Sequence, residues 1–232
     1  MKVKNHYLNN VVFLDVASET RVWPATVNYT PGRTVYTERL FTDKGVEYRT
    51  WDPYKSKLAA CLYEGLEGVP QLDTIRTLYL GAATGTTVSH VSDIIGDAGG
   101  VVYALEFSAR VARRLINLSQ ERQNIVPIVA DARKTDSYAH QVWTVDFLFQ
   151  DISQIDQAKI FVNNAQAFLR PGGTGLLIIK AASIDSTREA GEVADEQVAI
   201  LREAGLEVQK MVDISAFERE HRAVLVTKPT EN

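Results

Sequence analysis

Apolar and polar positions follow two alternating patterns from Leu72 to the end of the chain. Short, almost continuous apolar runs are typical of strands buried on both faces, and longer segments with helical spacing of apolar residues are typical of the helices that cover them. The runs predict strands over residues 74–80, 101–106, 125–130, 145–150 and 174–180. The amphipathic segments predict helices over residues 86–95, 109–122, 156–169 and 188–204. This alternation predicts an α/β fold with a mostly parallel sheet.

The end of the chain departs from strict alternation. Two further runs, residues 206–214 and 222–227, are separated only by residues 215–221, which are too few for a crossover helix. We therefore expect an antiparallel C-terminal strand at one edge of the sheet. A turn is also predicted at Pro171-Gly172-Gly173, before the strand at residues 174–180.

Residues 1–51 have a different pattern, which predicts a small β-rich domain. Short apolar or alternating runs occur at residues 11–14, 21–23 and 46–48, and the turn-forming residues Pro24, Pro31-Gly32 and Lys44-Gly45 interrupt them. Helical spacing begins at Asp52-Pro53, where Asp52 suits the N-cap and Pro53 the first helical position. We therefore predict two domains, residues 1–51 and 52–232.

Composition excludes several classes of protein. The 232 residues are 45% apolar and 23% charged, which excludes disordered and low-complexity chains. The net charge of −4 is too acidic for binding nucleic acid over a broad basic face, so an RNA or DNA substrate would need local patches or partners. The single cysteine, Cys61, indicates an intracellular protein, and the scattered histidines predict no metal site. No run is long enough to span a bilayer and no signal peptide is recognisable, so we expect no membrane association.

The loop from Gly81 to Thr87 is the most informative segment. It follows a predicted strand, contains only small residues and leads into a predicted helix. Such a loop brings backbone amides and the positive end of a helix to a ligand at the carboxyl edge of the sheet. It is not a P-loop, because only three residues separate Gly81 from Gly85 and no lysine follows, and it lacks the third glycine of the dinucleotide fingerprint. Taken alone, it is also compatible with a structural tight turn.

Carboxylates at the next two strand ends extend this pattern. Glu106 ends the second predicted strand, where a carboxylate can accept both ribose hydroxyls of an adenosine. Asp131 follows the third, where, with the amide of Ala132, it is placed to bind an adenine edge. Taken alone, either carboxylate is better interpreted as a loop cap or a solvated strand end. Together with the glycine loop they predict an adenosine pocket without a pyrophosphate site, as S-adenosylmethionine requires.

At this point the chain resembles the fibrillarin family, the RNA ribose 2′-O-methyltransferases of box C/D guide ribonucleoproteins. The resemblance covers nearly the whole chain. It is most specific in Gly81-Ala-Ala-Thr-Gly-Thr-Thr-Val-Ser-His-Val-Ser-Asp93, Tyr103-Ala-Leu-Glu-Phe-Ser108, Asp131-Ala-Arg133, Gln150-Asp-Ile-Ser-Gln-Ile-Asp-Gln157, Ile179-Lys-Ala181, Ser183-Ile-Asp-Ser-Thr187 and the segment 47–59. Two positions depart from the family's usual pattern: Ser153 stands where it has alanine, and Ile155 where it has proline.

The resemblance implies a Rossmann-like class I methyltransferase sheet, S-adenosylmethionine as cofactor, and rRNA, with tRNA as a further substrate. It implies as partners a box C/D guide RNA with its target RNA, a Nop-type scaffold protein and a kink-turn-binding subunit similar to a ribosomal protein. The Gly/Arg-rich extension of eukaryotic members is absent, which resembles the archaeal form and predicts a cytoplasmic location. The expected cofactor-binding residues are Gly81, Ala82, Ala83, Thr84, Gly85, Thr86, Thr87, Glu106, Phe107, Asp131, Ala132, Asp151 and Gln154.

The family's Lys-Asp-Lys arrangement implies the catalytic residues Lys57, Asp151 and Lys180, with His221 as a fourth member. Methyl transfer from a sulfonium needs alignment of donor and hydroxyl and help in removing the hydroxyl proton. We expect Lys180 to contact the 2′-hydroxyl, with Asp151 and Lys57 as orienting partners. Outside the family context, each lysine and the histidine would be interpreted as a solvated or capping side chain. Two alternative functions stay open: an NAD-dependent oxidoreductase, suggested by the glycine loop and Glu106, and a non-catalytic assembly subunit of a ribonucleoprotein.

Overall fold

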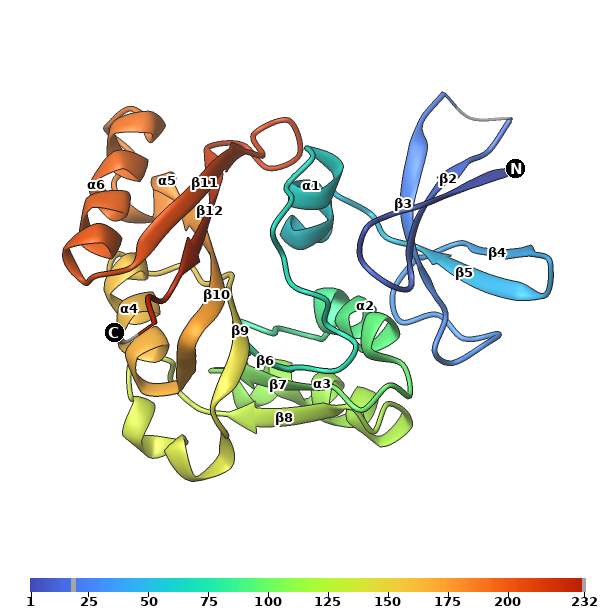
Figure 1. The fold of residues 1–232 in the computed structure, drawn as a ribbon, viewed down its shortest axis with the longest axis horizontal. Coiled ribbons are helices and arrows are strands. Elements are labelled where there is room, and N and C mark those ends of the chain that lie inside the picture. The colour runs from blue at the N-terminus through green and yellow to red at the C-terminus, as the bar shows by residue number, and fades with distance from the viewer. Residues whose placement is uncertain (18–19, 231–232) are drawn as a thin grey trace.

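The computed structural model describes residues 1–17 and 20–230 and contains two sheets (Figure 1). The first sheet has five strands in the order β1-β2-β3-β5-β4, all paired antiparallel. Its strands are β1 (Lys2–Asn5), β2 (Val11–Asp15), β3 (Val22–Val27), β4 (Leu40–Asp43) and β5 (Val46–Thr50). The predicted β-rich character of the N-terminal region is confirmed.

The sequence predicted that Pro24 interrupts a strand. In the structure it instead lies inside β3. There it pairs with Phe13 of β2, whereas the pairing of β3 with β5 begins only at Ala25. Proline is tolerated at this position because no β5 residue pairs with it, so the sheet loses no hydrogen bond through its missing N–H. The turn expected at Lys44-Gly45 is confirmed, since both residues have positive φ angles, 48° and 82°, in the two-residue connection from β4 to β5.

The second sheet has seven strands in the order β11-β12-β10-β9-β6-β7-β8. Its strands are β6 (Arg76–Leu80), β7 (Val101–Glu106), β8 (Ile125–Val129), β9 (Val145–Gln150), β10 (Leu169–Lys180), β11 (Glu207–Asp213) and β12 (His221–Thr227). The pairs among β8, β7, β6, β9 and β10 are parallel, and β12 runs antiparallel to both β10 and β11. The expected mostly parallel sheet with an antiparallel C-terminal strand is confirmed.

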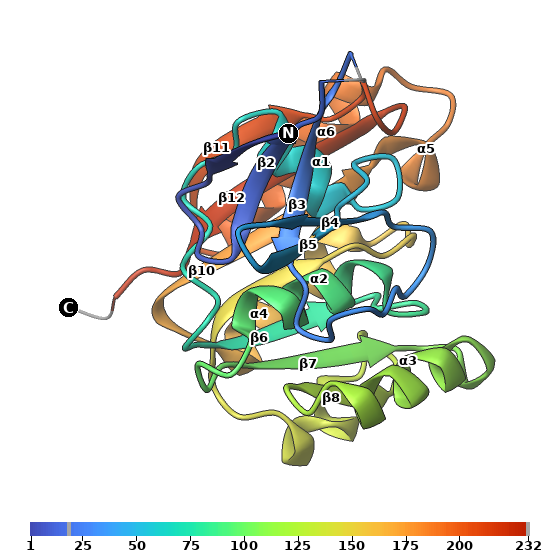
Figure 2. The ribbon, with the colours of Figure 1, turned by 90° about the vertical axis from the view of Figure 1, so that its right-hand side faces the viewer.

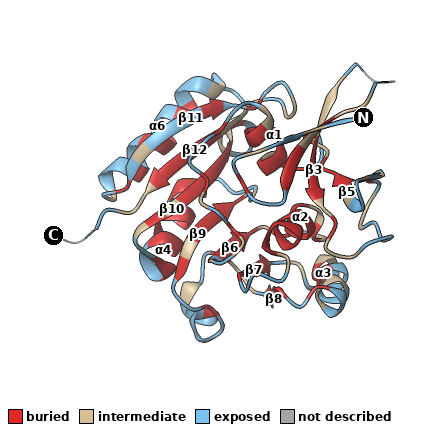
Figure 3. Cartoon of the chain, turned by 45° about the vertical axis from the view of Figure 1, so that its right-hand side comes forward, coloured by how far each residue is buried: buried red, intermediate tan, exposed pale blue. Residues whose placement is uncertain are grey.

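Helices cover both faces of this sheet (Figures 1 and 2). They are α1 (Lys57–Tyr63), α2 (Thr86–Ile95), α3 (Ala109–Glu121), α4 (Gln157–Phe168), α5 (Ala181–Ile184) and α6 (Ala190–Glu203), with short 3-10 turns at Thr135–Ser137 and Ala139–Gln141. Adjacent strand residues face opposite sides: Tyr79 packs in a core with α1 and α2, whereas Leu78 and Leu80 pack in a core with α4 and α6. Figure 3 shows these buried layers as the red centre of the molecule.

Two expectations about element boundaries need correction. Helix α1 begins at Lys57 with Ser56 as N-cap, and not at Asp52, because Asp52 instead closes a turn by accepting from the amide of Ser56 at 3.1 Å. The turn expected at Pro171-Gly172-Gly173 lies within β10, as a register shift against β9 between Leu169 and Thr174. There the Gly172 amide bonds to the Lys228 carbonyl at 2.7 Å, so pairing with a distant segment replaces the local turn. The one-turn helix α5 was not expected.

A buried ionic network joins the N-terminal sheet to α2. Asp93 of α2 accepts hydrogen bonds from Arg49 of β5 at 2.7 Å, from Arg122 at 2.6 Å and from the Thr26 hydroxyl at 2.6 Å. Arg49 also pairs with Glu38, and all these side chains are buried. A buried charge is tolerated only when it is fully paired, so the network fixes the N-terminal sheet against α2, the helix that follows the glycine loop.

Candidate functional site

The carboxyl ends of five parallel strands meet along one edge of the second sheet. The order β10-β9-β6-β7-β8 places there, one after another, Lys180, Asp151, Gly81, Glu106 and Asp131. The strand order reverses between β6 and β9, and an open α/β sheet forms its ligand crevice at such a point. The structure therefore brings together the strand-end residues that the sequence identified separately.

Gly81 allows β6 and β9 to approach each other at this crevice. The Asp151 amide donates to the Leu80 carbonyl at 2.9 Å, and a Cβ atom at Gly81 would lie 2.4 Å from the Asp151 carbonyl oxygen. Gly81 also has a φ angle of 89°, which side chains rarely adopt. Any larger residue here would displace the backbone that carries Asp151.

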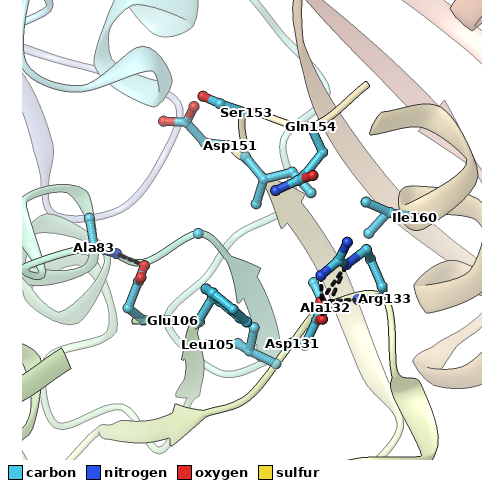
Figure 4. A pocket seen from close by; sticks show the side chains of 13 residues that line it. Ala83, Leu105, Glu106, Asp131, Ala132, Arg133, Asp151, Ser153, Gln154 and Ile160 are labelled. Carbon is cyan, nitrogen blue, oxygen red and sulfur yellow. Dashed lines mark hydrogen bonds and ion pairs between the residues drawn. The ribbon is translucent and has the colours of Figure 1, made fainter. Parts of the chain in front are cut away.

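Two backbone amides hold the Glu106 carboxylate in the crevice. The Ala83 amide donates to Oε2 at 3.0 Å and the Ser108 amide donates to Oε1 at 2.8 Å. Ala83 has a positive φ angle of 50°, and its amide points to Glu106 (Figure 4). Because each carboxylate oxygen has two lone pairs, each retains one for a diol. The orientation of Glu106 is thus fixed and its capacity to accept ribose hydroxyls remains.

A cavity of about 250 Å³ occupies the crevice. Eight of the expected cofactor-binding residues line it: Gly81, Ala83, Glu106, Phe107, Asp131, Ala132, Asp151 and Gln154. Leu105, Arg133, Ile152, Ser153 and Ile160 complete the lining. Figure 4 shows Glu106 and Asp131 on one side of the space, and Asp151, Ser153 and Gln154 on the other. Acidic, amide and apolar groups are therefore combined around one space, as an adenosine needs.

The other expected cofactor-binding residues do not line this cavity. Ala82 and Thr87 are buried, and the Thr87 hydroxyl donates to Ser56 at 3.0 Å. Thr84 and Thr86 line a separate cavity between α3 and the loop at residues 30–37. Gly85 is the N-cap of α2, with a φ angle of 96°. For these five positions a role in cofactor binding stays a prediction.

The Arg133 side chain is hydrogen-bonded to both oxygens of the Asp131 carboxylate. It donates from Nε to Oδ1 at 3.0 Å and from an Nη atom to Oδ2 at 2.8 Å, as the dashed lines in Figure 4 show. These hydrogen bonds are the main reason that the pKa of Asp131 is lowered. An adenine base that binds Asp131 therefore has to share the carboxylate with Arg133 or displace the Arg133 side chain from it.

The expected catalytic residues Lys57, Asp151 and Lys180 form one cluster. Lys180 Nζ lies 2.8 Å from Asp151 Oδ1, and Lys57 Nζ lies 3.7 Å from Asp151 Oδ2. The three side chains are only 13–20% exposed. Lys57 is at the first position of α1, where its N-cap Ser56 is hydrogen-bonded to Thr87 of α2. Lys57 and Lys180, more than a hundred positions apart in the sequence, thus both pair with the Asp151 carboxylate.

His221, the fourth expected member, lies at the start of β12, directly opposite Lys180 of β10. Its Nδ1 atom is 2.7 Å from the Arg219 carbonyl, which can only accept, so Nδ1 carries the proton and Nε2 is an acceptor in the neutral ring. Burial is the main cause that lowers the pKa of His221, and Lys57 and Lys180 add to this effect while the Arg219 carbonyl and Glu218 oppose it. The imidazole is therefore held neutral near the lysines.

Three contacts at this cluster were not predicted from the sequence. Glu218 Oε2 lies 3.8 Å from Lys57 Nζ, and Lys180 Nζ donates to Ser153 Oγ at 3.1 Å. The buried Gln157 side chain binds the backbone of Lys180 twice, accepting from its amide at 2.9 Å and donating to its carbonyl at 3.2 Å. The sequence marks Ser153 only as a departure from the family pattern. Nothing in the sequence indicates that Glu218, and not its acidic neighbour Glu220, contacts a lysine of the cluster.

Within residues 1–17 and 20–230, no cluster of three or more His, Cys, Asp or Glu side chains is arranged to hold a metal ion. The same described residues include no helix long and apolar enough to cross a membrane.

The fold and the strand-edge crevice define a Rossmann-like methyltransferase. Comparison with known proteins places the chain within this class: the family model Fibrillarin matches residues 3–230, so the chain belongs to the fibrillarin family. The fibrillarin-like rRNA/tRNA 2′-O-methyltransferase of Methanopyrus kandleri is 44% identical, and the match covers 97% of each chain. The recognition of this family from the sequence is confirmed.

Two solved structures are similar to the chain over nearly its full length. Aeropyrum pernix fibrillarin, crystallised with natively bound S-adenosyl-L-methionine, has a TM-score of 0.89 and 43% identity, covering 97% of this chain and 98% of that one. A fibrillarin in complex with Nop5p has a TM-score of 0.83 and 36% identity, covering 97% of this chain and all of that one.

Proposed function

We propose that this protein is an S-adenosylmethionine-dependent methyltransferase that acts on the ribose 2′-hydroxyl of RNA, in a ribonucleoprotein targeted by a box C/D guide RNA. The full-length similarity to proteins named rRNA/tRNA 2′-O-methyltransferases supports the activity, and the bound cofactor of the Aeropyrum pernix structure supports the methyl donor. Both alternatives from the sequence, an NAD-dependent oxidoreductase and a non-catalytic subunit, are without support among these relatives.

The observation that carries the proposal is that Asp151 belongs both to the cofactor cavity and to the lysine cluster. Asp151 lines the cofactor cavity and also holds Lys180 at 2.8 Å. A methyl donor in the cavity therefore lies beside two ammonium groups, where an acceptor hydroxyl can be bound. Proximity of this kind removes most of the entropic cost of bringing donor and acceptor together.

The residues of the cavity fit the cofactor. Glu106 has free lone pairs for the ribose diol, and Phe107, 69% exposed, offers a ring for stacking on adenine. The amide of Ala132 lies beside Asp131, as the recognition of an adenine edge requires. When bound, S-adenosylmethionine supplies a sulfonium-activated methyl group that leaves readily in an in-line displacement. The chain itself supplies binding, alignment and charge.

The cluster at Asp151 prepares the acceptor hydroxyl. Lys180 Nζ donates one hydrogen bond to Ser153 and forms an ion pair with Asp151, so it retains a donor for the 2′-oxygen. Lys57 adds a second positive charge beside the same carboxylate. Both cations stabilise the negative charge that develops on the 2′-oxygen as its proton leaves, and this charge is larger in the transition state than in the ground state.

The partners of the proposed ribonucleoprotein follow from the same family. The solved fibrillarin/Nop5p complex supports a Nop-type scaffold. The guide RNA and the kink-turn-binding subunit are further parts of the proposal, motivated by the net charge of −4, which leaves little general attraction for bare RNA. A cytoplasmic location is proposed with them.

Calorimetry with S-adenosylmethionine and with NAD tests the proposed class. We expect saturable binding of S-adenosylmethionine and none of NAD at the same concentrations. Binding of NAD alone would overturn the methyltransferase assignment. Transfer of a labelled methyl group to target RNA, with and without guide RNA and scaffold proteins, then tests whether the activity depends on the assembly.

A further inference from the structure

Each of the two lysines in the cluster is held between Asp151 and a second acceptor. For Lys180 the second acceptor is Ser153, and both of its contacts, 2.8 Å and 3.1 Å, are at hydrogen-bond distance. For Lys57 the second acceptor is Glu218, and its two contacts, 3.7 Å and 3.8 Å, are at ion-pair distance only. Lys57 is therefore located by charge between two carboxylates, with its hydrogen-bond donors still available.

The charges of the cluster balance only when Glu218 is included. Lys57 and Lys180 contribute two positive charges, and Asp151 supplies one negative charge within 4 Å of both. Glu218 supplies the second negative charge. The lysines are at most 20% exposed and Glu218 is 42% exposed, so water screens an unbalanced charge here less than at the open surface but does not remove the screening. Glu218 is thus placed where the cluster lacks an anion.

Packing on two sides fixes the loop that carries Glu218. The amides of Phe217 and Glu218 both donate to the Ile214 carbonyl at 3.0 Å, and the Ala181 amide donates to the Glu220 carbonyl at 3.2 Å. The Phe217 ring makes edge contacts with Tyr54 and Tyr63, each with a centroid distance of 5.2 Å. Tyr54 precedes α1 and Tyr63 is its last residue, so these aromatic contacts hold the loop against the helix that carries Lys57.

We propose that Glu218 is a positioning residue of the methyl-transfer reaction, which acts through Lys57. Its carboxylate holds the Lys57 ammonium away from Lys180, so that Lys180 retains Asp151 as its own partner. Without this anion, Lys57 has only Asp151 as a counter-charge and competes with Lys180 for it. This inference rests on the proposed function and adds one residue to its machinery.

The titratable groups around Lys57 determine how the reaction should depend on pH. The groups that face the cluster are Asp151 after β9, Lys180 at the end of β10, His221 at the start of β12, Glu218 in the loop before it, Cys61 on α1 itself and Tyr79 on β6. Removing the negative charge of Glu218 makes protonation of every neighbouring base less favourable. Both limbs of a pH–rate profile should therefore move to lower pH.

The test compares Glu218→Gln with Glu220→Gln in the assembled ribonucleoprotein. Both changes remove one carboxylate from the same loop, but Glu220 pairs with the exposed Arg219 at 3.4 Å and does not contact a catalytic lysine. The measurement is the single-turnover rate of methyl transfer to guided RNA against pH, at saturating S-adenosylmethionine. Calorimetry of cofactor binding and a thermal melt accompany each variant.

For Glu218→Gln we expect a loss of about tenfold in rate near neutral pH, a profile moved to lower pH by about half a unit or more, and unchanged cofactor affinity. Glu218→Asp should recover part of the rate and of the shift, and Glu220→Gln should match the wild type. A Glu218→Gln profile that coincides with the wild type overturns the inference, as does a rate loss explained by lost cofactor affinity or unfolding. Absence of transfer by the wild type would instead overturn the proposed function.

Discussion

Replacement of Asp151 by asparagine tests the catalytic cluster most sharply. Asparagine keeps the size of the side chain and the backbone carbonyl that packs against Gly81. It removes the charge that lies 2.8 Å from Lys180 Nζ and 3.7 Å from Lys57 Nζ. Of the negative charges beside the two ammonium groups, only that of Glu218 then remains. We expect the lysines to separate and the acceptor hydroxyl to lose its alignment.

The size of the effect follows from the geometry. An ammonium about 4 Å from a carboxylate is stabilised by about 1 kcal/mol in water and by about 4 kcal/mol at an effective dielectric constant of about 20. With side chains 13–20% exposed, the cluster lies between these limits. If about 2.7 kcal/mol of this stabilisation is expressed in the transition state, methyl transfer slows by about 100-fold.

Single-turnover methyl transfer in the assembled complex, at saturating cofactor, measures this loss. Asp146→Asn is the matched control, because Asp146 is in the same strand β9 near its opposite end and pairs with Arg170 at 2.6 Å. We expect Asp146→Asn to transfer at the wild-type rate, and cofactor affinity in Asp151→Asn to fall by less than about threefold. Near-normal transfer by Asp151→Asn would refute the role assigned to the cluster.

Three further predictions concern the cofactor crevice and three histidines whose pKa is lowered. Glu106→Ala should weaken S-adenosylmethionine binding in calorimetry by about 10- to 100-fold, the value of a hydrogen bond to a charged acceptor, and unchanged affinity would remove Glu106 from the pocket. Gly81→Ala should lower the free energy of unfolding more than Gly99→Ala. Both glycines have a positive φ angle, but of the two only Gly81 has atoms within 4 Å of an added Cβ, the nearest at 2.4 Å. Equal losses of stability in urea unfolding would contradict the close approach at Gly81. The pKa values of His6, His90 and His221 are all lowered from 6.5, mainly by burial, so the unfolded chain binds more protons below pH 6.5 and stability should fall as the pH decreases from 7 to 5. Equal free energies of unfolding at these two pH values would contradict that sign.

Most of the second sheet could be predicted from the sequence because its strands are buried on both faces. Such strands are nearly continuous apolar runs, and β7 and β9 begin and end where the pattern predicted. The strand-end positions of Glu106 and Asp151 followed directly. Helix α1 was expected to begin too early because Asp52 has the composition of an N-cap, while its side chain instead accepts the Tyr54 amide at 2.9 Å within a turn.

Contacts between distant charged residues could not be predicted. Arg49 and Asp93 are 44 positions apart and wholly buried, although charged residues are normally expected at the surface. The contact of Glu218 with Lys57 depends on how the loop after β11 packs against α1, and no local pattern encodes that arrangement. The pairing of Arg133 with Asp131 in the cofactor crevice was likewise not predicted from the sequence.

The measurement that tests the central claim most directly is the position of the transferred methyl group. The protein is assembled with a box C/D guide RNA and its scaffold proteins, and supplied with labelled S-adenosylmethionine and two target RNAs that differ only in a 2′-deoxyribose at the guided nucleotide. We predict one methyl group on the 2′-oxygen of the ribose target and none on the deoxyribose target. Equal labelling of both targets, or a methyl group on a base, would contradict the account.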